Sequence, residues 1–194
     1  MKMSRKLLPG ALAAVAALAL AVPAAVAYRR ACTERAGGHG TYVAGTDSKG
    51  KPIKRQFSFN AVEHQDGRVT GQAVIHNPAF DFRGHLEVSC LRVTPVDTNN
   101  DGQVDAYRAD IGGTVRNTND PALDGQNGFF TVFDFNEPGK RRDTISPVFF
   151  SPPDQPPTTA CELILGDPTA PSNLVQIPIE TGNIQAEDCP ENNL

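Results

Sequence analysis

Apolar and polar residues alternate one by one along much of this chain. Within Gln56–Val62, Phe57, Phe59 and Ala61 alternate with polar neighbours, and the same period returns in Val69–Ile75. Asp66-Gly67 lies between the two runs and is a typical turn sequence. Because successive side chains of a strand point to opposite faces, this pattern predicts an antiparallel hairpin.

The period-two pattern continues toward the C-terminus, and no apolar stripe with helical spacing occurs beyond residue 27. The glycine-rich run His39–Gly45 is interpreted as the start of a strand. The pattern predicts an all-β fold, a single antiparallel domain built as a sandwich or a barrel of about eight strands. The remaining predicted strands are His85–Val93, Asp105–Val115, Phe129–Phe133, Thr144–Phe150, Cys161–Leu165, Val175–Ile179 and a short last strand at Asn183–Ala186.

The first 27 residues follow a different pattern. A basic start (Lys2, Arg5 and Lys6) precedes the apolar run Leu7–Val22, and Ala25-Val26-Ala27 supplies the small residues that signal peptidase accepts. Residues 1–27 are therefore predicted to be a signal peptide and residues 28–194 the all-β domain. The expected location is secreted or extracellular, with the bacterial cell envelope as an alternative and no membrane insertion after cleavage.

The charge balance narrows the class of partner. Without residues 1–27 the chain keeps 15 basic and 22 acidic residues, a net charge of −7. Binding to nucleic acid or to an anionic membrane needs clustered positive charge, so neither is expected. An unknown protein or a cell-envelope component is the expected partner.

Four cysteines follow the predicted cleavage point, and an even number in an oxidising compartment predicts two disulfides. Three pairings are possible. The favoured one joins Cys90 to Cys161, in two predicted strands, and Cys32 to Cys189, near the two ends of the domain.

An acidic loop, residues 94–106, carries the one stretch with metal-ligand spacing. Its candidate ligands are Asp97, Asn99, Asp101, the carbonyl of Gln103, and Asp105, and Gly102 allows the sharp turn between them. This order resembles the first nine residues of an EF-hand loop, as also used in dockerin repeats. The resemblance implies a Ca²⁺ site of modest affinity, with a Kd on the order of 10⁻⁴–10⁻³ M.

The loop departs from that family at its twelfth position, where Arg108 stands in place of a bidentate carboxylate. Arg108 and Asp110 share one face of the predicted strand. Whether Asp110 reaches back to the acidic loop as a ligand is left open. The flanking segments are predicted strands, so calcium would stabilise a hairpin and would not open helices. An ordinary polar turn is the alternative interpretation.

No catalytic residue is assigned, and the chain is not expected to be an enzyme. Two alternatives stay open. A small hydrolase could use two carboxylates from Asp134, Glu137 and Asp143 as an acid–base pair, as glycoside hydrolases do. A lipocalin-like barrel would instead hold a ligand in an apolar cavity inside its strands.

Several short segments are similar to a group of small exported bacterial all-β proteins that have no assigned activity. In that group the two strands around the acidic loop form a plain hairpin. The resemblance therefore implies that the loop is an insertion and that calcium is an accessory feature. The matching segments are Phe57–Ala61, Val88–Val93, Ile111–Val115, Glu137–Gly139 with Asp143, and Gly182–Gln185.

Overall fold

The computed structural model describes residues 33–136, 142–152, 154 and 174–189. These residues form nine strands and one short 3₁₀ turn, so the predicted all-β class is confirmed. The elements are β1 (Arg35–Thr46), β2 (Pro52–Glu63), β3 (Val69–Asn77), η1 (Pro78–Phe80), β4 (Phe82–Val96), β5 (Ala106–Arg116), β6 (Asn127–Asp134), β7 (Thr144–Ile145), β8 (Phe149–Ser151) and β9 (Ile177–Glu187). Within the described residues, no helix is long and apolar enough to cross a membrane.

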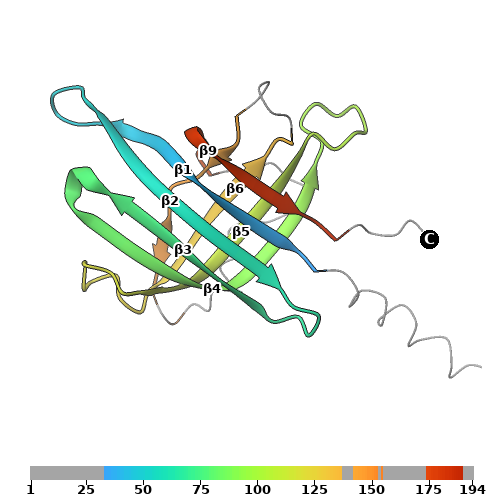
Figure 1. Ribbon diagram of the computed structural model, residues 1–194, viewed down its shortest axis with the longest axis horizontal. Coiled ribbons are helices and arrows are strands. Elements are labelled where there is room, and N and C mark those ends of the chain that lie inside the picture. Colours follow the sequence, from blue (N-terminus) through green and yellow to red (C-terminus); the bar gives the residue numbers. More distant parts are fainter. Residues whose placement is uncertain (1–32, 137–141, 153, 155–173, 190–194) are drawn as a thin grey trace, which may run out of the picture.

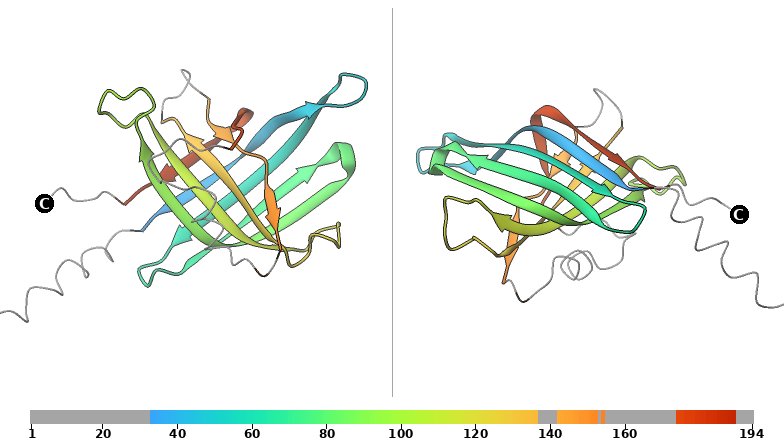
Figure 2. Two further views of the ribbon diagram at one scale, coloured as in Figure 1. Left: turned by 180° about the vertical axis from the view of Figure 1, so that it is seen from behind. Right: turned by 60° about the horizontal axis from the view of Figure 1, so that its bottom comes forward.

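The strands close into an antiparallel barrel, which decides between the two predicted architectures. The hydrogen-bonded order is β5-β4-β3-β2-β1-β9-β7-β6, and β5 also pairs with β6. In Figure 1, β1 to β3 and β9 cross in front of β5 and β6. The view from behind in Figure 2 shows the opposite wall. Closure removes the free strand edges of an open sheet.

The long strand β4 carries a β-bulge in its pairing with β5. Its register with β5 shifts between Val88 and Cys90, so that Ser89 is an extra residue in β4. A bulge bends a strand and increases its twist. Leu86 and Val88 point inward before the bulge, and Val93 points inward after it.

Aromatic side chains fill the middle of the barrel. The rings of Phe57 and Phe59 lie 6.2 Å apart, and Phe130 meets Phe59 edge to face at 5.4 Å. The glycines of β1 make room for them, because a Cβ at Gly40 would collide with the ring of Phe57 and with the backbone oxygen of Thr181. The glycine-rich sequence of β1 therefore follows from packing.

The predicted strand Thr144–Phe150 is divided in two. Its ends form β7 and β8, which pair with opposite ends of the same edge of β6. Pro147 lies between them and has no N–H to donate to a ladder. The Ser146 hydroxyl accepts the N–H of Thr131 at 3.0 Å in the interruption.

The C-terminal prediction was wrong in one detail. The predicted segment Val175–Ile179 enters a strand only from Ile177, and it continues through Asn183–Ala186 as the single strand β9. The register of β9 with β1 shifts between Thr41 and Tyr42. The predicted strand Cys161–Leu165 lies outside the described residues.

Candidate functional site

One end of the barrel holds a cavity of about 360 Å³. It lies between the end of β3, the start of β4, the end of β5 and the loop that follows β5. Phe130, from the central aromatic group, forms part of its inner wall. Its apolar lining includes Ile75, Phe82, Leu86, Val115, Leu123 and Phe130.

The cavity opens to solvent at this end, because some of its lining residues are exposed. Phe150 is 39% exposed, and Asp120, in the loop after β5, is exposed as well. Protein interiors are normally packed with few voids larger than a water molecule. A void of this size lined by apolar side chains is therefore a candidate ligand site.

Four polar residues line the cavity: Arg55, Asn77, His85 and Asp120. The side chain of His85 points away from the interior, because its neighbour in β4, Leu86, points inward. The Asn77 side chain accepts the N–H of Ala79 and caps η1. Asp120 accepts the N–H of Ala122 at 3.0 Å. The side-chain oxygens of Asn77 and Asp120 therefore hold local backbone structure. Arg55 lies on the inward face of β2, the same face as Phe57.

Arg55 was missed in the sequence analysis, although a signal was present. The alternation of β2 places Phe57, Phe59 and Ala61 inward, and two residues earlier the same phase falls on Arg55. A cationic side chain at a strand position that alternation turns inward indicates either that the strand is wrongly predicted or that the cation has a function. The cavity itself could not be predicted, since it depends on residues from six strands and two loops.

The predicted calcium ligands lie at the tip of the β4–β5 hairpin, where the Asp97 carboxylate organises the loop. It accepts N–H groups from Asn99, Asp101 and Gly102, the last at 2.7 Å. Burial alone would raise the pKa of Asp97, but these backbone N–H groups outweigh it and lower the pKa.

The other predicted ligands of the loop bond to one another and to its backbone. Asn99 donates to Asp101 at 3.1 Å, Gln103 donates its N–H to Asp101, and Asp105 accepts from the N–H and the hydroxyl of Thr98. Within the described residues, no three His, Cys, Asp or Glu side chains are grouped to hold a metal ion. The calcium site stays a prediction.

Arg108, the residue at the twelfth position, does not point into the loop. It is a fully buried residue of β5, with its Nε 3.2 Å from Asp110 Oδ2. Asp110 also accepts the Thr131 hydroxyl at 3.0 Å and lies 3.5 Å from the guanidinium of Arg92. Burial raises the pKa of Asp110, and the two arginines and Thr131 oppose that rise. Asp110 is thus held by these neighbours and does not reach back to the acidic loop.

Two of the predicted hydrolase acids hold the barrel together. Asp134 accepts the N–H groups of Asn136 and Ala186, both at 2.9 Å. Asp143 accepts those of Phe135 at 3.2 Å and Ile184 at 2.9 Å. All four carboxylate oxygens are therefore occupied by backbone donors.

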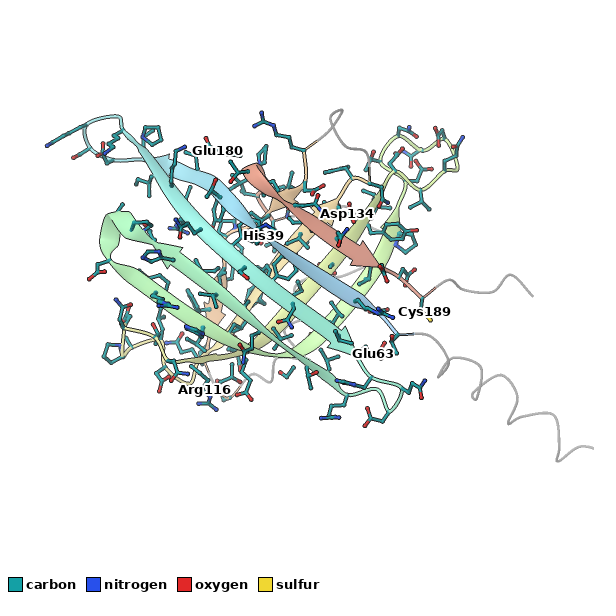
Figure 3. All side chains as sticks on the ribbon, viewed as in Figure 1. His39, Glu63, Arg116, Asp134, Glu180 and Cys189 are labelled. Carbon is teal, nitrogen blue, oxygen red and sulfur yellow. The ribbon has the colours of Figure 1, made fainter. Side chains whose placement is uncertain are left out.

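The surroundings of these acids favour a structural role. Figure 3 shows Asp134 beside β9, toward the end that also carries Cys189 and Glu63. Burial raises the pKa of Asp134, the two backbone donors oppose that rise, and the nearby Asp143 adds to it. The third acid, Glu137, lies outside the described residues.

Only two of the four cysteines fall within the described residues. Cys90 and Cys189 are not free thiols. Cys32 and Cys161 lie outside the described residues, so the predicted pairs Cys90–Cys161 and Cys32–Cys189 stay a prediction.

Comparison of the chain with protein-family models, with curated proteins and with solved structures finds no match.

Proposed function

We propose that this protein is a binding barrel for a small, largely apolar molecule, and that the cavity at the β3–β4 end is its binding site. The observation that carries the proposal is the cavity of about 360 Å³ among apolar side chains of a closed barrel. Ligand sites of roughly 300–1,000 Å³ with a mostly apolar lining and a few polar groups are the usual kind.

The barrel geometry supports this function. Eight strands enclose just enough space for side chains to fill the interior or for one small ligand to bind. Here the aromatic group Phe57, Phe59 and Phe130 fills the middle of the barrel, and the small Ala73 lies next to the unfilled end. The interior is thus divided into a packed part and a part with room for a ligand.

The proposal includes export, two disulfides and a calcium-stabilised loop as accessory features. A closed barrel with additional covalent and ionic restraints would suit a protein that works outside the cell. The acidic loop does not form part of the cavity, because it lies at the opposite end of β4 and β5.

The test uses an uncharged naphthylamine dye, N-phenyl-naphthylamine, whose fluorescence rises in apolar surroundings. Titration of the full domain is expected to show saturable binding with one site per chain. Ile75→Trp places a larger side chain in the cavity and is expected to weaken dye binding at least about tenfold, which corresponds to about 1.4 kcal/mol.

The matched control is Val74→Trp, on the same strand. Val74 faces away from the interior because neighbouring residues of a strand point to opposite faces. It is expected to leave dye binding unchanged. Absence of saturable binding to the unmodified protein would contradict the proposed function, as would equal loss in the two variants when both keep the circular dichroism spectrum of the parent.

A further inference from the structure

Arg55 is a cation placed inside the apolar cavity. It lines the cavity from the first half of β2, and its Nε is buried with no hydrogen-bond partner in the described segments. Among the described residues it forms no salt bridge, whereas its neighbour Lys54 pairs with Glu180 on the outer face at 2.7 Å. The two adjacent cations therefore differ, since only the outer one has a protein counter-ion.

A second donor lies directly beside Arg55. Tyr42 of β1 is its register partner, and the side chain of Tyr42 is fully buried. Within the part of the chain that the structure describes, the hydroxyl of Tyr42 has no hydrogen-bond partner. Buried donors without acceptors cost free energy, and native proteins rarely retain them without a reason. Two such donors side by side indicate that their acceptor is not among the described residues and that a bound ligand could supply it.

The other polar groups around the cavity do not supply that acceptor. Asn77 uses its oxygen to cap η1, and Asp120 is exposed on the loop and accepts the N–H of Ala122. His85 lies on β4, where its register partners are Val74 and Arg116. The described lining thus contains one permanent cation with no anion paired to it.

We propose that the natural ligand has an apolar body and a single anionic head group of carboxylate type, and that the guanidinium of Arg55 is its counter-ion. This inference rests on the proposed function and adds the class of ligand. A planar guanidinium can donate two parallel hydrogen bonds to a carboxylate, and such charge-assisted bonds are stronger than neutral ones. The apolar wall formed by Ile75, Phe82 and Leu86 would hold the body of the ligand.

The experiment compares two molecules that differ only in the head group. Decanoate and decanol are each used to displace the uncharged dye at about pH 8, where decanoate is ionised. Decanoate is expected to bind at least about tenfold more tightly than decanol to the unmodified protein. Arg55→Gln is expected to abolish this preference and to leave dye and decanol binding within about twofold.

Two further variants separate a specific contact from general charge. Lys54→Gln removes the same charge from the outer face of the same strand and is expected to keep the full preference for decanoate. Arg55→Lys keeps the charge without the planar fork and is expected to keep part of the preference. This variant also gives a readout if Arg55→Gln does not fold.

The outcomes are distinguishable from failure of the proposed function. Equal affinity for decanoate and decanol would overturn the anionic ligand and leave the binding barrel in place. If the dye binds but neither decanoate nor decanol displaces it, the anionic ligand would be overturned as well. An equal loss of preference in Lys54→Gln and Arg55→Gln would assign the effect to net charge and would also overturn the role of Arg55.

Discussion

The two halves of the barrel wall are joined in different ways. From β1 to β5 the strands form long ladders, such as the unbroken register of Gln56–Glu63 with Val69–His76. Between β6 and β9 the described residues place one strand, β7, which has two residues and pairs with β9 at Thr144 and Ile145. We call the β6–β7–β9 region the seam.

Carboxylates replace the missing ladder in the seam. Beyond β7, the N–H groups of Ile184 and Ala186 in β9 have no strand carbonyl on that side, and Asp143 and Asp134 accept them instead. Glu34 acts in the same way where β4 runs past the first residues of β3, since it accepts the N–H of Val93 at 2.8 Å. The comparison shows that a barrel can close over a short strand when side chains supply the acceptors.

Removing those acceptors is expected to have the largest effect on the free energy of unfolding. Asp134→Ala or Asp143→Ala leaves two backbone N–H groups without their acceptor, and hydrogen bonds to charged groups are worth about 1.5–3 kcal/mol each. We expect each variant to lose about 2–4 kcal/mol of unfolding free energy, measured by urea denaturation. Amide hydrogen exchange should accelerate first at Ala186 for Asp134→Ala and at Ile184 for Asp143→Ala.

A matched change in the continuous wall is Asn60→Ala. Asn60 also accepts a backbone N–H, from Gln72 at 3.0 Å, but at an exposed position where water can replace it. Its expected loss is below about 1 kcal/mol. Equal losses in the seam and in the wall would show that the carboxylates of the seam carry no special share of stability.

A smaller effect is expected from titration of Glu34. Burial, together with Glu63 and Asp188, raises its pKa from 4.5 to about 7, against the opposing effects of the Val93 N–H and Arg92. The folded protein therefore holds this proton more tightly than the unfolded chain, and unfolding releases it at intermediate pH. Stability should fall by about 1–2 kcal/mol as the pH rises from about 4.5 to about 7, after allowance for the half-buried position.

Urea denaturation between pH 4.5 and pH 8 measures this slope. Glu34→Gln keeps an oxygen acceptor for Val93 and should flatten the slope, whereas Glu87→Gln, at an exposed position on β4, should leave it unchanged. A slope that persists in Glu34→Gln would assign the titration to another group.

The smallest effect on stability is expected at the acidic loop, which joins β4 and β5 in the part of the barrel with long ladders. About 10 mM calcium should raise the Tm by a few degrees if the Kd is on the order of 1 mM, since binding to the folded state alone stabilises by RT ln(1 + [L]/Kd). Asp101→Ala should remove this increase, and magnesium should not reproduce it. Identical melting of both proteins with and without calcium would leave the loop as a polar turn.

Sequence patterns predicted the wall better than the seam. The hairpin around Asp66-Gly67 and the strands on either side of the acidic loop are confirmed, because local alternation and turn residues determine them. The division of Thr144–Phe150 was not predicted, although Pro147 indicated it. The roles of Asp134 and Asp143 depend on donors 52 and 41 residues away, which no local pattern reveals.

The candidate sites show the same limit. The acidic loop is contiguous, so its position at a hairpin tip follows from its own nine residues and their flanks. The cavity is lined by residues spread along the chain from Arg55 to Phe150. Its volume depends on how their side chains pack together, which no local sequence pattern reveals. Arg55 was recoverable from its phase in β2, but its lack of a partner was not.

The first residue of β1 and the last of β9 are neighbours, since Arg35 and Glu187 are register partners. Both lie at the end of the barrel away from the cavity, because Arg35 pairs with Val62 near the end of β2, whereas Arg55, which lines the cavity, lies near its start. Anything fused or tethered through either strand would therefore sit behind the barrel, with the cavity mouth facing away from the attachment. An immobilised or displayed form of this protein should keep its cavity accessible.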